Sequence, residues 1–386
     1  MDFMLTLPPL SLYIHVPWCV KKCPYCDFNS HRLNGDIPED AYISALLHDF
    51  QNELSQVQGR AIHSIFIGGG TPSLLSGKAY QRLFDGLQKH VSFTDDIEIT
   101  MEANPGTYEH DRFQSYIDAG VNRISLGVQS FQDEKLQKLG RIHSAAEAYQ
   151  AIKSIIESGF TNINIDLMHG LPNQSLDDAL HDLQRAIELK PAHISWYQLT
   201  IEPNTVFYSK TPVLPPDDTL WDIQEAGQKL LASAGFEQYE ISAYSQADKR
   251  SRHNLNYWQF GDYMGIGAGA HGKLTDLSTG QIIRNWKTRM PADYLAASDE
   301  QQAFETGRRI LAVDELPIEF MMNVLRLNHG VEQGLYRART GENLDSITAS
   351  LALAQQKGLL EPLEQGRLQP TPTGRLFLND LLELFT

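Results

Sequence analysis

The chain has 386 residues, of which 42% are hydrophobic and 21% charged, and its formal net charge is −16. This length allows a large buried core and fits one large domain with a smaller one. The acidic balance argues against a general nucleic-acid binder, because phosphate contacts need clustered Lys and Arg side chains. We therefore expect no nucleic-acid partner.

The first ten residues and the hydropathy pattern indicate the cellular location of the protein. Residues 1–10 have an acidic second position and a Pro-Pro pair, in place of the basic start and apolar core of a signal peptide. No apolar run approaches the roughly 18 residues of a membrane span, and an acidic chain without a basic amphipathic helix has no membrane signal. We predict a cytoplasmic protein that contacts membranes only through its partners.

Short β-branched runs alternate with helical patterns over the first 245 residues, which is typical of a parallel sheet wrapped by helices. Amphipathic segments with apolar residues every three or four positions lie between these runs. The predicted strands cover residues 12–16, 64–68, 98–104, 123–129, 162–168 and 193–201. This order predicts an α/β fold built as a partial (β/α)6 barrel of the TIM type, spanning residues 1–245.

The pattern changes after residue 245. A connecting segment is predicted at 246–305; it holds the motif His-Asn-Leu-Asn-Tyr-Trp at 253–258. A small C-terminal α+β domain is predicted at 306–386. Its predicted elements are a helix at 344–356, a hairpin of 359–363 with 367–369, and a last helix at 374–385. This order resembles a winged helix, but few basic residues are present, so packing or partner docking is favoured over DNA binding.

Polar or glycine residues follow almost every predicted strand. The loops after the strands of a parallel barrel form its active site, so we expect these residues to converge at one mouth. They are residues 19–26, the glycine run 68–71, Glu102, Gln129, Asp166 and Thr200. Simple turn formation explains the glycines but not the repeated Glu, Gln and Asp.

Cys19, Cys23 and Cys26 are the only cysteines and lie within one short stretch after the first predicted strand. In a reducing compartment such spacing marks a metal site more often than a disulfide framework. Thiolates are the usual iron–sulfur ligands, and a cubane held by three of them leaves one iron open. Structural zinc takes four ligands, and His15 or His31 could supply the fourth, so the spacing favours a cluster and leaves zinc open.

The run Tyr-Ile-His-Val-Pro-Trp at 13–18, followed by CxxxCxxC, resembles the radical S-adenosylmethionine superfamily and its coproporphyrinogen oxidase-like branch. In that branch S-adenosylmethionine binds the open iron, and an electron from the cluster cleaves it to a 5′-deoxyadenosyl radical. The resemblance implies the radical S-adenosylmethionine type of partial barrel. It also implies two cofactors, a 4Fe-4S cluster on Cys19, Cys23 and Cys26, and S-adenosylmethionine.

The same resemblance implies which residues contact S-adenosylmethionine. The Gly-Gly-Gly-Thr-Pro motif at 68–72 matches a loop whose glycines allow close approach of the methionine amino group. Arg141 matches the residue that pairs with the methionine carboxylate, which suits a forked guanidinium. The full implied set is Tyr13, Tyr25, Gly69, Gly70, Thr71, Glu102, Gln129, Arg141 and Asp166. Each of these residues, considered alone, could instead have a purely structural role, such as loop packing for Tyr25 or a helix N-cap for Asp166.

Position 28 separates two groups within the branch. The coproporphyrinogen III dehydrogenases carry a further cysteine two residues after the third ligand, where this chain has Phe28. The long motifs CPYCDFNS, IGGGTPSLL and HNLNYW and the C-terminal FLNDLLELF resemble instead the heme chaperones of the branch. That resemblance implies binding of heme and its transfer to hemoproteins such as respiratory enzymes. The cluster and S-adenosylmethionine would then support transfer or dimerisation, which leaves a homodimer open.

By the same resemblance, His253 of the HNLNYW motif is the expected heme ligand. A neutral imidazole suits an axial position, and Tyr257 and Trp258 could cover a porphyrin face. Aromatic residues near a histidine are also common in protein cores, and His271 is the rival ligand. Two other functions stay open: a radical decarboxylase of coproporphyrinogen, and a structural zinc protein. Whether S-adenosylmethionine is cleaved is open as well.

Overall fold

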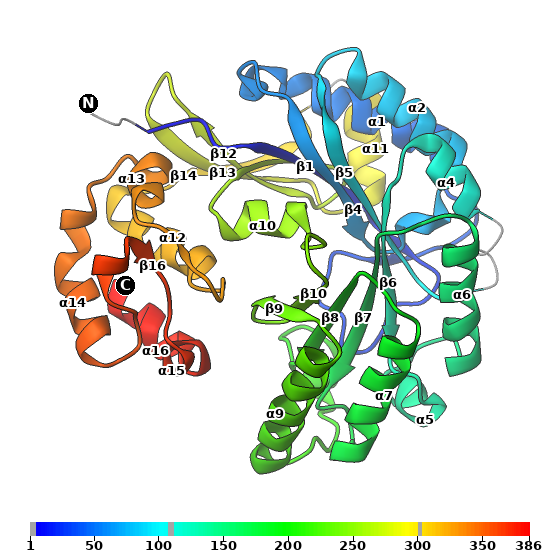
Figure 1. Cartoon of the computed structure of the whole chain (residues 1–386). Coiled ribbons are helices and arrows are strands. Elements are labelled where there is room, and N and C mark those ends of the chain that lie inside the picture. The colour runs from blue at the N-terminus through cyan, green and yellow to red at the C-terminus, as the bar shows by residue number, and fades with distance from the viewer. Residues whose placement is uncertain (1–4, 107–111, 300–302) are drawn as a thin grey trace.

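The computed structural model describes residues 5–106, 112–299 and 303–386. Its centre is one curved sheet, and six neighbouring strands at the middle of this sheet run parallel (Figure 1). In spatial order they are β1 (Leu10–Val16), β4 (Ile62–Gly69), β5 (Phe93–Ala103), β6 (Arg123–Gln129), β7 (Ile163–His169) and β8 (His193–Gln198). Each overlaps one predicted strand, so the expected partial barrel is confirmed.

Helices cover the outer face of this sheet (Figure 1). Local signals in the sequence set where several of them begin: Ser144 and Ser175 form capping boxes with Glu147 and Asp178, which bond the free N–H groups of the first turn. The helices of this layer are α1 (Glu39–Asn52), α2 (Gly77–Gln88), α4 (Phe113–Ala119), α5 (Asp133–Lys138), α6 (Ala145–Glu157), α7 (Leu176–Glu188) and α9 (Asp217–Ser233).

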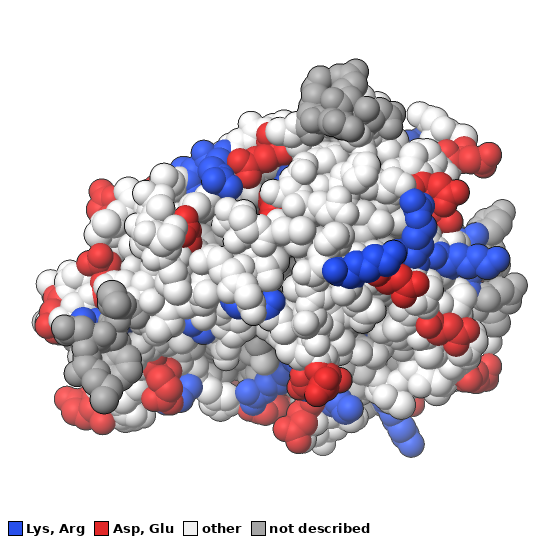
Figure 2. All heavy atoms as spheres, turned by 90° about the horizontal axis from the view of Figure 1, so that it is seen from above, with Lys and Arg blue, Asp and Glu red and all other residues white. Residues whose placement is uncertain are grey.

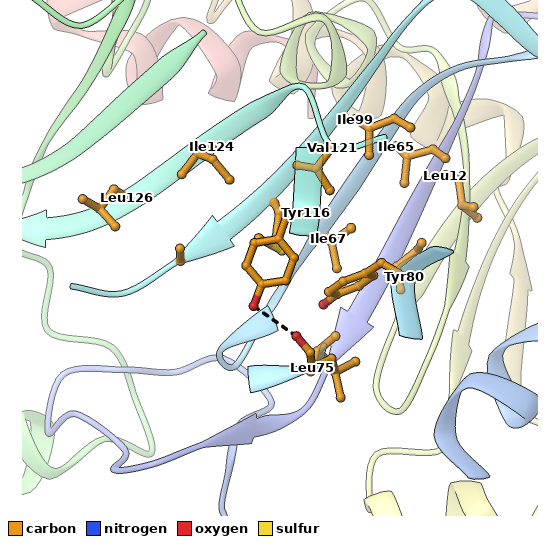
Figure 3. Close-up of a cluster of buried hydrophobic side chains, with 14 of the residues drawn as sticks. Leu12, Ile65, Ile67, Leu75, Tyr80, Ile99, Tyr116, Val121, Ile124 and Leu126 are labelled. Carbon is orange, nitrogen blue, oxygen red and sulfur yellow. Dashed lines mark hydrogen bonds between the residues drawn. The ribbon is translucent and has the colours of Figure 1, made fainter. Parts of the chain in front are cut away.

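The main core lies between the strands and this helical layer, as Figure 3 shows. Leu12, Ile67 and Leu126 point from the strands toward the helices and are fully buried. Tyr116 from α4 is buried with them, and its hydroxyl donates to the backbone carbonyls of Ser73 and Leu75 at 2.7 and 3.1 Å. Each large side chain buried in this way contributes about 1.5–3 kcal/mol, while the satisfied tyrosine hydroxyl avoids a desolvation cost.

Further strands extend the sheet on both sides. The order is β14-β13-β12-β11 before β1, and β10-β9 after β8. Only β11 among them pairs in parallel, with β1; the others are antiparallel. Their bounds are β9 (Glu237–Glu240), β10 (Ala243–Ser245), β11 (Asp262–Ile266), β12 (His271–Asp276), β13 (Gln281–Lys287) and β14 (Glu305–Ile310).

The stretch 246–305, predicted as a connecting segment, therefore contributes strands β11, β12 and β13 to the main sheet. It also contains α10 (Arg252–Trp258), which lies on the open side of the curved sheet (Figure 1). The physical reason is the edge of β1, whose backbone N–H and C=O groups need partners that β11 supplies. The division into domains at 245 and 306 stays a prediction.

The C-terminal residues form a second unit with its own hydrophobic core, to which Phe260 and Ile282 of the preceding chain also belong. Its elements are α12 (Leu316–Val324), β15 (Val331–Glu332), α13 (Gly334–Thr340), α14 (Thr348–Gln356), β16 (Arg367–Leu368), α15 (Pro372–Leu376) and α16 (Leu378–Leu382). The predicted helix at 344–356 corresponds to α14, preceded by a 3-10 turn.

Two details of this unit differ from the prediction. Strand β16 pairs with β15, and the stretch 359–363 adds only one isolated bridge, between Leu360 and Pro370. Pro362 lacks a backbone donor, which weakens a strand at that place. The predicted last helix is divided at Phe377, whose backbone is not helical, into α15 and α16.

Two features concern the surface. Within the described residues, no helix has the length and apolar character that a membrane span requires. On the face seen in Figure 2, Lys and Arg side chains lie in small groups beside Asp and Glu side chains.

Candidate cofactor site

The three cysteines follow β1: Cys19 ends the short strand β2 (Trp18–Cys19), and Cys23 and Cys26 lie on the loop between β2 and β3 (His31–Arg32). All three thiols line one cavity of about 380 Å³ at the carboxyl ends of the parallel strands. Polar side chains lie near each of them: Thr71 Oγ1 lies 3.7 Å from Sγ of Cys19, Arg141 Nη1 lies 3.7 Å from Sγ of Cys23, and Ser30 Oγ lies 3.8 Å from Sγ of Cys26.

In the described part of the chain, no three His, Cys, Asp or Glu side chains are grouped so as to hold a single metal ion. Burial raises the pKa of the Cys19 and Cys26 thiols above the ordinary value. Metal binding at these positions must therefore release protons, as thiolate ligation generally does.

The glycine run after β4 brings the cysteine loop against the sheet. The backbone N–H of Gly70 donates to the carbonyl of Val16, and that of Thr71 donates to the carbonyl of Trp18, both at 2.7 Å. A Cβ on Gly70 would lie 2.4 Å from the Trp18 carbonyl oxygen, and Gly69 has a φ of +110° that favours glycine. Contacts within the chain therefore require glycine at these positions, whichever ligand the cavity holds.

Glu102 and Asp166 are two of the carboxylates that line the same cavity. Glu102 accepts a hydrogen bond from the backbone N–H of Gly69 at 3.1 Å. Asp166 accepts from the Ser125 hydroxyl at 2.9 Å and from the Asn164 amide at 2.8 Å. Burial, reinforced by the charge of Asp166, raises the pKa of Glu102 to about 7, and burial also raises the pKa of Asp166. A cationic ligand group would relieve the repulsion between these two carboxylates.

Basic side chains line the cavity as well, and one of them is Arg141. It donates to the Gly127 carbonyl at 2.6 Å and to Oδ1 of Asn104 at 2.5 Å. Gln129, with a φ of +70°, accepts from the Tyr197 hydroxyl at 2.8 Å. The ring of Tyr25 packs against Phe207 with centroids 6.3 Å apart. Since no carboxylate among the described residues pairs with Arg141, it can receive an anionic ligand group.

Eleven of the residues predicted for the site thus line this one cavity: the three cysteines, Tyr25, Gly69, Gly70, Thr71, Glu102, Gln129, Arg141 and Asp166. The sequence interpretation missed other polar side chains that line it from alternate positions of the same strands. These are Asn104, Ser125, Asn164, Ser195 and Tyr197. Side chains two residues apart on a strand lie on the same face, so the position of Asp166 could have predicted that Asn164 lines the cavity too.

Tyr13 lies outside this cavity, in the wall of a neighbouring one. Its hydroxyl contacts Nδ1 of His15 at 3.0 Å, and Nε2 of His15 contacts the Asn29 carbonyl at 2.8 Å. Both ring nitrogens of His15 are therefore used, which argues against His15 as a fourth zinc ligand. His31, the other candidate, contacts Oδ1 of Asn29 at 3.3 Å.

His253 also lies outside the cofactor cavity. It is buried in α10, its Nδ1 contacts the Ser64 hydroxyl at 3.2 Å, and its Nε2 contacts the Tyr257 hydroxyl at 2.9 Å. The ring stacks on Phe66 with centroids 5.1 Å apart. Burial lowers the pKa of His253 to about 3. Both ring nitrogens of His253 thus have hydrogen-bond partners in this structure, and its role as the heme ligand stays a prediction.

The neighbouring cavity is larger, about 880 Å³, and the sequence interpretation did not foresee it. The cysteine loop, α10 and the strands β11 to β13 form its wall, and Phe28 and Trp258 line both cavities. Its aromatic and cationic members are Tyr13, His15, Phe28, Tyr257, Trp258, Tyr263, His271, Lys273, Arg284, Trp286, Lys287 and Arg289. Pairs of lining residues two apart on one strand, such as Arg284 and Trp286 on β13 or His271 and Lys273 on β12, are the signal of a shared face in the sequence.

Comparison with known proteins agrees with this geometry. The model of the Radical SAM superfamily matches residues 13–186, and the model of the HemN C-terminal domain matches residues 311–377. The heme chaperone HemW of Escherichia coli (strain K12) is 55% identical over 382 residues, which cover 99% of each chain. The chain belongs to the HemW family. Two further HemW proteins are similar along the whole length. The one from Haemophilus influenzae is 53% identical over 387 residues, which cover 99% of each chain. The one from Bacillus subtilis is 33% identical over 381 residues, which cover 97% of this chain and 98% of that one.

The same fold has been solved in a coproporphyrinogen III oxidase (HemN) from Escherichia coli, a radical SAM enzyme. That structure matches 98% of this chain and 90% of its own with a TM-score of 0.82, at 24% sequence identity. HemW family members and this oxidase therefore share the radical SAM sheet and the C-terminal unit, as predicted from the motifs.

Proposed function

We propose that this protein binds heme and transfers it to hemoproteins such as respiratory enzymes, with a 4Fe-4S cluster and S-adenosylmethionine as resident cofactors. The proposal draws on relatives at 55% and 53% identity, each named a heme chaperone. The observation that carries it is structural: the three thiols line one cavity together with Glu102, Asp166 and Arg141, and a larger aromatic cavity adjoins it. A cytosolic location is part of the proposal, because a reducing compartment keeps the three thiols available.

The donor chemistry fits an iron–sulfur cluster. Cys19, Cys23 and Cys26 supply three soft thiolates for three irons, and the fourth iron is left for S-adenosylmethionine. When bound, the two cofactors supply one-electron chemistry.

The charges of the cavity fit S-adenosylmethionine, which carries an ammonium, a sulfonium and a carboxylate. We assign Arg141 to the carboxylate, because a forked guanidinium bonds carboxylates with two parallel hydrogen bonds. Glu102 and Asp166 suit the cationic groups. Tyr25, Gln129 and the glycine run 69–70 with Thr71 complete the wall around the cofactor.

A second candidate is the oxygen-independent decarboxylation of coproporphyrinogen III. The TM-score of 0.82 to a coproporphyrinogen III oxidase favours it at the level of the fold alone. Phe28 speaks against it. This side chain, 61% exposed, stands at the border of both cavities where the dehydrogenases of the branch carry a cysteine.

The deciding experiment uses protein purified without oxygen and reconstituted with iron and sulfide. One sample is titrated with heme, and a parallel sample is assayed for decarboxylation of coproporphyrinogen III. We expect saturable heme absorbance at one heme per chain and no decarboxylated product. Decarboxylation without heme binding would instead establish the second candidate.

A further inference from the structure

A chain of hydrogen bonds leads from the wall of the cofactor cavity into the interior of the protein. At the cavity, Asp166 accepts from the Asn164 amide at 2.8 Å and from the Ser125 hydroxyl at 2.9 Å, and the same amide donates to the Ser125 hydroxyl at 2.7 Å. Asn164 and Asp166 are two residues apart on β7, so their side chains lie on one face of the strand. Asn164 therefore holds one oxygen of Asp166 directly and the other through Ser125.

His193 of β8 lies directly behind Asn164. Its Nδ1 is 2.6 Å from Oδ1 of Asn164, and its Nε2 is 2.9 Å from the Tyr239 hydroxyl. The Ser195 hydroxyl donates to the same Oδ1 at the longer distance of 3.1 Å. His193 is fully buried and does not line the cavity, whereas Asn164 and Ser195 do. Any influence of His193 on a ligand in the cavity must therefore pass through Asn164.

Only one tautomer of His193 fits these contacts. The amide nitrogen of Asn164 donates to the carboxylate of Asp166, so Oδ1 of Asn164 is an acceptor and Nδ1 of His193 must carry the proton. Burial lowers the pKa of His193 well below its ordinary value, so the ring is neutral. Nε2 then accepts from the Tyr239 hydroxyl. Both ring nitrogens are used, and the single ring proton points at Asn164.

We propose that His193 is a positioning residue for S-adenosylmethionine: its Nδ1–H fixes the side chain of Asn164, which in turn orients the carboxylate of Asp166 toward the cofactor. The inference rests on the proposed function, in which Asp166 contacts S-adenosylmethionine. A side chain that bonds a ligand-binding group from behind contributes to affinity by fixing the orientation of that group. In metal sites the loss of such a partner lowers affinity about ten- to hundredfold.

The test compares two amides at position 193 in the reconstituted full-length protein, titrated with radiolabelled S-adenosylmethionine. The nitrogen of an Asn side chain takes the place of Nδ1 and can still donate to Asn164, whereas that of a Gln side chain takes the place of Nε2 and cannot. We expect His193→Gln to weaken binding roughly tenfold or more. His193→Asn should keep the dissociation constant within about threefold of the wild-type value. A merely structural role predicts the reverse order, because Gln is closer to His in volume.

His169→Gln is the matched control. His169 ends β7 and is buried like His193, and its ring forms no hydrogen bond with a described residue. This variant should bind S-adenosylmethionine as the wild type does, and all three variants should keep the iron and sulfide content of the cluster. If the wild type does not bind S-adenosylmethionine, the proposed function fails in this respect and the inference fails with it. If the wild type binds it and the two variants at position 193 bind it equally well, only this inference is overturned.

A second measurement needs no stable His193→Gln protein. In the wild-type chain labelled with ¹⁵N-histidine, the nitrogen chemical shifts report which ring nitrogen carries the proton, and the signals absent from His193→Asn identify His193. We expect the proton on Nδ1. A proton on Nε2 would mean that the ring accepts from Asn164, and the positioning role would be rejected.

Discussion

Cys23 occupies the wall of the cofactor cavity, with its Sγ 3.7 Å from Nη1 of Arg141. Its backbone carbonyl accepts from the N–H of Cys26, a contact that any side chain preserves. We expect Cys23→Ala to lose bound iron and sulfide and the brown absorbance of the cluster, while the free energy of unfolding of the cofactor-free chain changes by less than about 0.5 kcal/mol. Iron analysis and urea unfolding check this. A full complement of iron in the variant would rule out Cys23 as a ligand.

Glu102 makes the stability of the cofactor-free chain depend on pH. Its pKa is raised from 4.5 to about 7 on folding, so the folded state keeps a proton that the unfolded state loses as the pH rises through this window. The free energy of unfolding therefore falls from about pH 4.5 to about pH 7, and for this partly buried group the fall is on the order of 1–3 kcal/mol. Glu102→Gln should reduce that fall.

Urea unfolding at several pH values across this window measures the slope for both proteins. Glu157→Gln is the matched control, because Glu157 is exposed on α6, and it should keep the wild-type slope. If Glu102→Gln keeps the wild-type slope, the carboxyl of Glu102 does not cause the pH dependence of the free energy of unfolding.

At the scale of elements, the contact between β4 and the cysteine loop decides whether the three thiols face one cavity. Gly70→Ala places a methyl group 2.4 Å from the Trp18 carbonyl oxygen, so the loop must shift. We expect a loss of stability of about 1–3 kcal/mol, typical of overpacking, together with a lower iron content after reconstitution. Gly334→Ala is the control, since a Cβ there meets nothing within 4 Å. Equal behaviour of the two variants would contradict the close approach.

At the scale of the whole molecule, the second core joins the C-terminal unit to the main sheet. Phe320 of α12 is fully buried and packs against Phe260, with ring centroids 5.6 Å apart. Phe320→Ala should destabilise the protein by about 3–5 kcal/mol through the cavity it leaves. Phe377→Ala, which removes a ring that is 55% exposed, should change the free energy by less than about 0.5 kcal/mol. Thermal unfolding of both variants compares them, and similar losses would mean that Phe320 is not a core residue.

Local patterns were sufficient for the six parallel strands and for most of the cofactor cavity. Most of these strands are short buried runs, although β5 has 11 residues and an exposed acidic start. Glycines, carboxylates and thiols lie at or just after the strand ends. Glu102, Gln129 and Asp166 could be assigned because the carboxyl ends of neighbouring parallel strands always meet at one edge of a sheet. Ser144 and Ser175 likewise mark helix starts through contacts three residues away.

Contacts between distant parts of the chain could not be inferred in this way. Strand β11 pairs with β1 across about 250 residues of sequence, because an open edge accepts any strand that reaches it in register. The burial of His253 follows from that topology, which places α10 on the open side of the sheet with Ser64 and Phe66 against its ring.

The composition, the cysteine spacing and the strand pattern thus identify a radical S-adenosylmethionine barrel, since each depends on chemistry or periodicity within a few residues. The second cavity exists only because the tertiary structure folds β12 and β13 back beside the cysteine loop. The contact of His253 with Ser64 of β4 likewise depends on packing between segments far apart in the chain, which the sequence pattern does not specify.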